Sequence, residues 1–387
     1  MTRRLLLVHS GTELYGSDRV CLWIMEALIG NGWEVEIVLP SAGDLAGAAA
    51  ALGVPVHTID PVPLRRADVG TIRGLSGPLR WPAGIPRLVS IARSGGFDLV
   101  HTNTLPALGG WVAARAAGLP LVWSVHEILL PSRYLGWYQR LVRDADAVLC
   151  CSRAVTEQFQ PSLAARCRVV HSGADLPERH RGTVPFHHPP WQISMVGRLN
   201  GWKGHDVLVD ATRILVGEGY DVAALLIGGT FGADDRPLRR LTEQVSTSGV
   251  SERIRVLGHR PDAIDLVAGS DVFTLPSTRP EPFGIALVEA MALARPCVAS
   301  ASGGPLEIVQ SGVDGILVHP GDPESLAGAI AGFIDDPSRA IEIGARAAVR
   351  ALDFDRSRMT DEILAVYDEV ASRSRRRAGR RTGEGSR

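Results

Sequence analysis

The chain alternates short apolar runs with longer segments whose apolar residues recur at helical spacing. Helices are predicted over Ser17–Ile29 and Leu105–Ala117, and the second is followed by Gly118, a residue type common just after a helix end. Apolar strands separated by helices are typical of a parallel sheet covered on both faces. In the first half the predicted strands are Arg4–His9, Glu34–Leu39, Val54–Ile59, Asp98–Thr102, Leu121–Val125, Ala147–Cys151 and Arg168–His171.

The pattern stops near residue 177 and starts again at Trp191. The stretch between is rich in proline, charge and histidine, which is typical of a linker. We therefore predict a first α/β domain over residues 1–177, a linker over 178–190 and a second α/β domain over 191–352. The strands of the second domain are predicted at Gln192–Val196, Ala223–Ile227, Arg253–Leu257, Asp271–Leu275, Pro296–Ala299 and Gly315–Val318.

The end of the chain carries one more helical pattern. Apolar residues recur at helical spacing from Met359 to Val370, and Asp355 is a candidate N-cap. We predict a helix within residues 353–372 that crosses back to the first domain. Residues 373–387 are rich in Arg, Gly and Ser with little to bury, so we expect a disordered basic tail.

Composition excludes some classes of partner. The chain has 387 residues, a formal net charge of −1, 45% hydrophobic and 21% charged residues. No global field attracts nucleic acid or a membrane, so any such contact has to be local. No run is long enough to span a bilayer or to form a signal peptide, and the five cysteines form no Cys-x-x-Cys pair. We expect a cytoplasmic protein with buried free thiols.

Glycines, cations and carboxylates follow successive predicted strands of the second domain. In a doubly wound sheet, ligands bind beyond the carboxyl ends of the strands. Glycines let backbone amides approach a ligand, cations match phosphate, and a helix N-terminus attracts anions. These residues therefore predict a site for a phosphorylated ligand. They are Gly197, Arg198, Lys203, His259, Arg260, Glu281, Phe283 and Gly284, together with the turn Gly303-Gly304-Pro305 and Glu307.

Glu281 and Glu289 form a second signal. Glu281 precedes a predicted helix, and Glu289 lies about 7–8 Å along its axis from Gly284 at 1.5 Å per residue. Carboxylates at this separation, with amides and cations between them, fit the hydroxyls of two sugars joined by a diphosphate. The alternative for such a pair is a solvated helix face.

On these residues the chain resembles the retaining glycosyltransferase family 4, which has the GT-B fold of two Rossmann-like domains facing across a cleft. The resemblance rests on G-R-x(4)-K-G at Gly197–Gly204, E-x(7)-E from Glu281 to Glu289, and the glycine turn before Glu307. The first domain matches more loosely. It carries Tyr15-Gly16-Ser17-Asp18, where the family usually has a double glycine and a Glu, and Ser124-Val125-His126-Glu127.

The resemblance implies a role for each matching residue. Arg198 and Lys203 would bind the donor diphosphate and stabilise the leaving nucleotide, while Glu281, with the backbone of Phe283 and Gly284, would contact the donor sugar. Glu289 would bind the ribose. The remaining roles fall to Gly197 in the diphosphate loop, His259 and Arg260 beside the base, Gly16 against the phosphates, and His126 near the transferred sugar.

The implied reaction retains the anomeric configuration and uses no metal. Family members are thought to react by front-side attack, in which the leaving phosphate accepts the proton of the acceptor, so that the protein supplies position and charge. Metal-dependent transferases of the other major fold use Asp-x-Asp. Here Asp144-Ala-Asp146 precedes its strand and Asp353-Phe-Asp355 begins a helix, so neither is expected to bind a metal.

The acceptor and the donor base stay open at this stage. Arginines and aromatic residues gather in segments 65–93 and 133–143. They favour either a lipid-linked or anionic acceptor with peripheral docking at an anionic membrane, or ordinary solvated arginines. A polysaccharide acceptor, GDP-mannose and UDP-hexoses are compatible with the motifs. Two other functions are open: a nucleotide-sugar epimerase and a non-catalytic sugar-nucleotide-binding subunit. Specific nucleic-acid binding has no folded motif behind it.

Overall fold

The chain folds into two units, each with its own sheet. The computed structural model describes residues 2–62, 84–129, 135–176, 186, 188–230 and 234–384. Unit 1 consists of Met1–Ser172 with Ser357–Arg387, and unit 2 consists of Gly173–Arg356. Most of the predicted linker, residues 65–83 of the arginine-rich segment 65–93, and residues 133–134 of the segment 133–143 lie outside the described residues.

The boundary of unit 2 differs from the predicted domain limits of 177 and 352 at both ends. Ala174 forms a parallel bridge with Asp355. The Ala174 N–H donates to the carbonyl of Phe354 at 2.9 Å, and the Arg356 N–H donates back to Ala174 at 3.0 Å. These backbone hydrogen bonds join the two ends of unit 2, and no pattern of residue types along the chain predicts them.

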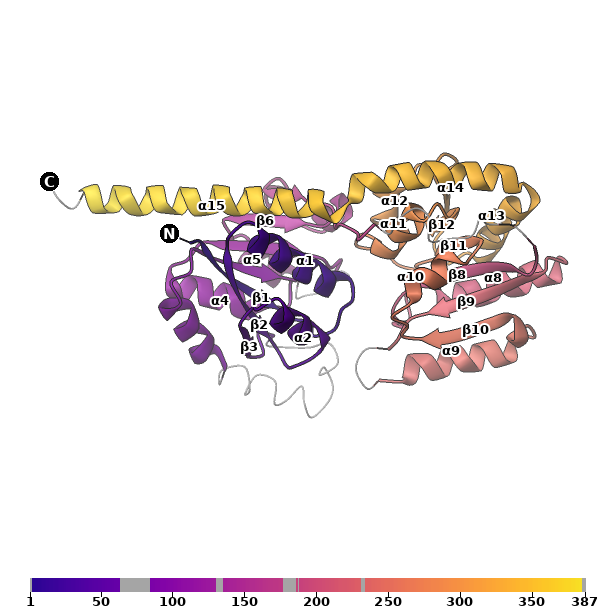
Figure 1. The fold of residues 1–387 in the computed structure, drawn as a ribbon, viewed down its shortest axis with the longest axis horizontal. Coiled ribbons are helices and arrows are strands. Elements are labelled where there is room, and N and C mark those ends of the chain that lie inside the picture. The colour runs from indigo at the N-terminus through magenta and orange to yellow at the C-terminus, as the bar shows by residue number, and fades with distance from the viewer. Residues whose placement is uncertain are drawn as a thin grey trace. The chain divides into compact units, whose positions relative to one another are not determined.

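Unit 1 contains a parallel sheet in the order β3-β2-β1-β4-β5-β6-β7 (Figure 1). Most residues of the inner strands are apolar and buried because helices cover both faces. In β1, for example, every residue after Arg4 is buried. The strands are β1 (Arg4–His9), β2 (Glu34–Leu39), β3 (Val56–Thr58), β4 (Leu99–Asn103), β5 (Leu121–Val125), β6 (Ala147–Cys150) and β7 (Cys167–Val169).

Helices α1 and α4 lie close to the two helices predicted between these strands, Ser17–Ile29 and Leu105–Ala117. Helix α4 ends, as predicted, at Gly118, which has a left-handed φ of 68°. Cys21, Cys150, Cys151 and Cys297 are buried, in line with the prediction for the thiols. The helices are α1 (Gly16–Gly30), α2 (Asp44–Ala51), α4 (Leu108–Ala117), α5 (Leu135–Val142), α6 (Arg153–Glu157), α7 (Pro161–Ala164) and α15 (Arg356–Glu384).

Helix α15 packs on unit 1 and runs further than the sequence predicted. Met359, Ile363 and Tyr367 are buried along one face. The expected disordered tail over 373–387 is corrected, since α15 continues to Glu384. Arg and Ala are good helix formers, and Glu369 pairs with Arg373 one turn on.

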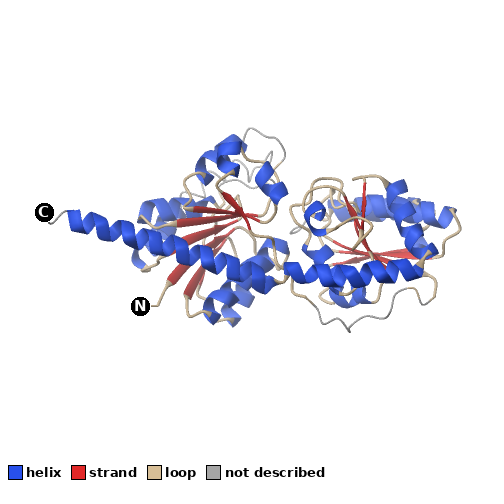
Figure 2. Cartoon of the chain, turned by 90° about the horizontal axis from the view of Figure 1, so that it is seen from above, coloured by secondary structure: helices blue, strands red, loops and turns tan. Residues whose placement is uncertain are grey.

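Unit 2 repeats the doubly wound arrangement with the strand order β10-β9-β8-β11-β12-β13. Figure 2 shows the strands of each unit lying between helices, so the predicted α/β class is confirmed. The strands are β8 (Trp191–Val196), β9 (Val222–Ile227), β10 (Ile254–Gly258), β11 (Val272–Leu275), β12 (Cys297–Ser300) and β13 (Ile316–Val318).

The helices of unit 2 enclose an apolar core that includes Ile193, Leu208 and Leu226, all at most 1% exposed. Among the described residues, no helix is both long and apolar enough to cross a membrane. The helices are α8 (His205–Gly217), α9 (Arg236–Thr247), α10 (Ala263–Ala268), α11 (Ile285–Ala292), α12 (Pro305–Ile308), α13 (Pro323–Asp335) and α14 (Pro337–Ala351), with short 3₁₀ turns η2 (Ser251–Arg253) and η3 (Leu352–Phe354).

Candidate active site

The sheet of unit 2 places most of its predicted site residues in loops next to a topological switch point. Strands β8 and β11 are neighbours, and the strands that follow each of them in the chain, β9 and β12, lie on opposite sides of this pair. In doubly wound sheets, the crevice beyond the carboxyl ends of such strands is where ligands bind. The loops that follow β8, β11 and β12 carry the motifs that the sequence singled out.

The loop after β8 folds so that Lys203 lies beside Gly197, where the loop begins. The Gly197 N–H donates to the carbonyl of Ile227 at 2.9 Å, and Leu199 within the loop is buried. Gly204 ends the loop with a φ of +83°, and a Cβ there would lie 1.9 Å from the carbonyl oxygen of Pro276. Only glycine permits both this backbone conformation and this approach to the end of β11.

Lys203 and Glu281 form the central ion pair. The Lys203 Nζ lies 2.8 Å and 2.7 Å from the two carboxylate oxygens of Glu281. The hydroxyl of the buried Ser277 donates to the same carboxylate at 2.9 Å. Lys203 also lies over the ring of Trp202, 4.6 Å from its centroid. The two predicted residues are therefore in contact, and Ser277 is a partner that the sequence did not identify.

The turn after β12 fixes the backbone of Glu281. The Glu281 N–H donates to Ser302 at 3.3 Å, and the Gly304 N–H donates to the carbonyl of Glu281 at 2.7 Å. Gly303 has a φ of +74°, and a Cβ there would lie 2.2 Å from the same carbonyl oxygen. The glycines of this turn are thus required by close backbone packing, and they hold the carboxylate against Lys203.

Glu289 lies inside α11, as predicted, and is 5% exposed; Glu281 has the same exposure. A solvated helix face is therefore the wrong interpretation of this pair. Gly284 begins α11 with a φ of +117°. Phe283 before it is buried and packs edge-on against Phe354, with centroids 5.6 Å apart.

Arg198 and the predicted base-binding turn lie along the same edge of the sheet. Arg198 follows β8 and is partly exposed. His259 and Arg260 follow β10, two strands from β8, and both are exposed. The Arg260 guanidinium donates two hydrogen bonds to Asp262, at 2.7 Å and 2.6 Å. This pairing raises the pKa of Arg260.

Two predicted residues, Gly16 and His126, belong to unit 1. Gly16 begins α1, is exposed, and a Cβ on it would meet no atom within 4 Å. His126 follows β5, and its Nε2 lies 2.8 Å from Oδ1 of Asn103. Burial, with a smaller contribution from His9, lowers the pKa of His126 to about 3. This imidazole is therefore neutral at physiological pH.

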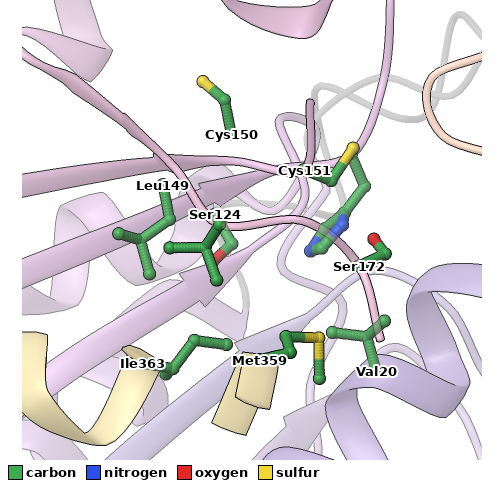
Figure 3. Close-up of a pocket in the computed structure, with 10 residues that line it drawn as sticks. Val20, Ser124, Leu149, Cys150, Cys151, Ser172, Met359 and Ile363 are labelled. Carbon is green, nitrogen blue, oxygen red and sulfur yellow. The ribbon is translucent and has the colours of Figure 1, made fainter. Parts of the chain in front are cut away.

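His126 also contributes to a small, mostly apolar cavity of unit 1. Figure 3 shows Ser124, Cys151 and Ser172 lining this cavity, with Met359 of α15 and Val20 of α1 on one side. The C-terminal helix therefore contributes directly to the surroundings of this histidine.

His205 is a neighbour of the candidate site that the sequence did not indicate. Its Nε2 lies 3.1 Å from the carbonyl of Gly197, so it ties the start of α8 to the start of the loop. Burial, and to a smaller extent Lys203, lower the pKa of His205 to about 4. Its position directly after the Gly204 turn was the available signal.

The two Asp-x-Asp segments have structural contacts. Asp144 accepts a hydrogen bond from Nε1 of Trp111, and Asp146 accepts one from the backbone of Leu121. Asp353 accepts from Arg350. Within the part of the chain that the structure describes, no three His, Cys, Asp or Glu side chains are grouped to hold a metal ion.

Comparison with known proteins agrees with this geometry. The family described as Glycosyltransferase Family 4 matches residues 15–178, and that described as Glycosyl transferases group 1 matches residues 178–350. D-inositol 3-phosphate glycosyltransferase 1 of Catenulispora acidiphila is 30% identical over 345 residues, which cover 81% of this chain and 81% of that protein. The corresponding enzyme of Xylanimonas cellulosilytica is also 30% identical and covers 94% of this chain and 93% of its own.

Solved structures show the same fold. The crystal structure of Anabaena HepE in complex with UDP and glucose matches with a TM-score of 0.79 and 25% identity, over 94% of this chain and 99% of that chain. Sucrose-phosphate synthase of Thermosynechococcus elongatus matches with a TM-score of 0.76 and 21% identity, over 96% and 99%. The predicted family is confirmed: the chain belongs to glycosyltransferase family 4, has the GT-B fold and is a glycosyltransferase.

Proposed function

We propose that this glycosyltransferase transfers a hexose from a nucleotide-diphosphate sugar with retention of configuration and without a metal. The observation that carries the proposal is the Lys203–Glu281–Ser277 cluster at the switch point of unit 2. A cation at this crevice matches a diphosphate, and a carboxylate held in place matches sugar hydroxyls.

In the proposed reaction, the bond between C1 of the sugar and the phosphate oxygen breaks. A bond from C1 to the acceptor oxygen forms on the same face, and the acceptor proton passes to the leaving phosphate. Lys203 and Arg198, with the N-terminus of α11, stabilise the charge that develops on that phosphate. Glu281 and Glu289 hold the hexose and the ribose. A divalent ion is not needed if these cations meet the diphosphate directly.

The relatives supply the first compounds to test. The HepE structure contains UDP and glucose, and several relatives are named D-inositol 3-phosphate glycosyltransferases. We therefore propose a UDP-hexose as the first donor and a phosphorylated polyol or a glycan as the first acceptor. A lipid-linked acceptor reached by peripheral membrane contact is a further proposal, which sedimentation with anionic liposomes tests.

The deciding experiment is calorimetric binding of UDP-, GDP- and ADP-sugars, with and without EDTA. We expect one nucleotide to bind in the presence of EDTA, and Arg198→Ala or Lys203→Ala to weaken it about 10- to 100-fold, the value of a charged hydrogen bond. Arg213→Ala, on the exposed face of α8, is the matched control and should bind as the wild type. Binding that requires a metal, or no binding of any nucleotide sugar, contradicts the proposal.

Turnover tests the proposed retention of configuration and the need for an acceptor. With acceptor present, the anomeric coupling in the proton NMR spectrum of the product should match that of the donor. Conversion of the donor into another hexose without acceptor supports the epimerase instead. Donor binding without turnover on any acceptor tried supports the non-catalytic subunit.

A further inference from the structure

A chain of hydrogen bonds at the carboxyl edge of the unit 1 sheet leads from α1 to His126. The carboxylate of Asp18 lies 2.7 Å from Nε2 of His9. Nδ1 of His9 lies 3.0 Å from the side-chain nitrogen of Asn103. Oδ1 of Asn103 lies 2.8 Å from Nε2 of His126. The chain therefore connects β1, β4 and β5 through buried polar groups, of which His9 and Asn103 are fully buried.

The direction of the Asn103 amide follows from a second contact. Its Nδ2 lies 3.2 Å from the carbonyl oxygen of Ser17, which can only accept a hydrogen bond. The amide nitrogen must therefore face Ser17 and His9. The amide oxygen then faces His126 and can only accept, so Nε2 of His126 carries a proton.

The second ring nitrogen of His126 follows from proton counting. A neutral imidazole carries one proton, so Nδ1 of His126 holds a lone pair. The titratable groups around this ring are His9, His101 and Glu127. Burial lowers the pKa of His126, which keeps the imidazole neutral. The backbone N–H of His126 donates to Glu127 at 3.1 Å, so the main chain of this residue is held as well as its ring.

We propose that Asn103 is a positioning residue that fixes His126 in the Nε2–H tautomer and makes its Nδ1 a permanent acceptor for a hydroxyl of a sugar substrate at the carboxyl edge of the unit 1 sheet. This inference rests on the proposed function. His9 and Asp18 hold the amide of Asn103 from behind, which explains why a polar chain this long is buried next to the apolar strands. His126 then accepts a hydrogen bond and does not act as a cation toward phosphate.

The identity of Gly11 fits the same arrangement. A Cβ on Gly11 would lie 2.0 Å from the carboxylate of Asp18 and 2.9 Å from Nε2 of His9. Any larger residue at position 11 would break the hydrogen bond between Asp18 and His9. The start of α1 at Gly16 and the position of His126 are thus connected through Asp18, whose carboxylate also accepts from the backbone of Tyr15 at 3.3 Å.

The tautomer is measured by long-range nitrogen–proton NMR of the full chain with ring-labelled histidine. His126→Gln identifies the signals of His126 among the 11 histidines. The wild type should show the neutral Nε2–H pattern between pH 6 and 8. Asn103→Leu should show an averaged or reversed pattern. A wild-type Nδ1–H pattern, or an unchanged pattern in Asn103→Leu, overturns the inference.

Kinetics provides the second readout. Asn103→Leu should lower kcat about 10- to 100-fold, as expected for a displaced reacting contact, with less than a 3-fold change in the KM of the donor. Ser10→Ala removes a different hydrogen bond at the same edge, 2.7 Å to Thr104, and is the matched control with kcat near the wild type. Equal losses in both variants indicate general loosening and contradict the inference.

The pH profile of Asn103→Asp completes the test. The new carboxylate stabilises the imidazolium, so the pKa of His126 rises and Nδ1 becomes protonated as the pH falls. The variant should recover kcat with rising pH, while the wild type stays flat over the same range; parallel profiles contradict the inference. If the wild type binds no nucleotide sugar, the proposed function fails, whereas the NMR pattern still decides the tautomer.

Discussion

The Lys203–Glu281 pair lies largely out of water, since 18% and 6% of the two side chains are exposed. Removing one partner of such a pair leaves the other charge buried, which costs more than the pair itself contributes. The same pair is proposed to meet the donor. Stability and activity therefore depend on these two residues in different ways, and substitutions can separate the two effects.

We expect Lys203→Met to lower the free energy of unfolding by about 2 kcal/mol, because the Glu281 carboxylate loses its cation. Lys203→Met combined with Glu281→Gln should regain at least about 1 kcal/mol of that loss, since no unpaired charge remains. Turnover should stay at least about 100-fold below the wild type in both. Urea unfolding and initial rates provide the two measurements. Additive losses of stability would show that the charges are not coupled, and recovered turnover in the double variant would rule out the electrostatic role.

At the scale of the elements, Tyr367 joins α15 to the sheet of unit 1. It is fully buried, and its hydroxyl is hydrogen-bonded to Nδ1 of His101 at 2.6 Å. His101 Nε2 in turn lies 2.8 Å from the hydroxyl of Ser124. A helix near the C-terminus is thus connected through one histidine to β4 and β5, next to the cavity that His126 borders.

Tyr367→Phe should therefore destabilise unit 1. The change removes the hydroxyl and leaves Nδ1 of His101 buried without this hydrogen bond, at a cost of about 1–3 kcal/mol. Tyr220→Phe is the matched control, because its hydroxyl bonds the exposed Asp335 at 3.0 Å and should change stability by less than about 0.5 kcal/mol. Urea denaturation followed by tryptophan fluorescence measures both. Equal effects in the two variants would mean that the buried bond does not stabilise the docked helix.

Elements were predictable where a local pattern decides them, and the site was predictable where one motif carries it. Apolar runs located the described strands of the two sheets within a few residues, and the glycine and charge motifs identified Lys203, Glu281 and Glu289 as candidate site residues. Ser277, Asn103 and Tyr367 were not identified as partners. Each of them acts through a contact with a residue distant in sequence or on another element, and no spacing along the chain encodes that contact. The bridge between Ala174 and Asp355, which joins the two ends of unit 2, was not predicted for the same reason.

At the scale of the whole molecule, both units bury neutral histidines. Burial lowers the pKa of His101 in unit 1 to about 3 and that of His205 in unit 2 to about 4, from an ordinary value of 6.5. Below pH 6.5 the unfolded chain therefore binds protons that the folded chain does not, and stability falls as the pH falls. Glu127, whose pKa is raised by burial, works in the opposite direction within unit 1. The effect should be clearest in unit 2.

We expect the free energy of unfolding to be nearly constant from pH 8 to 7 and to fall by about 2 kcal/mol for each buried histidine between pH 6.5 and 5, at about 1.4 kcal/mol per pH unit. Urea unfolding at four pH values measures the slope. His205→Gln keeps a donor toward Gly197 but cannot titrate, so it should flatten the slope of the unit 2 transition, while the exposed His188→Gln should leave it unchanged. An unaltered slope in His205→Gln would show that this histidine is not the group that makes unit 2 sensitive to acid. Because the two histidines belong to different units, a single substitution should shift one transition and leave the other in place.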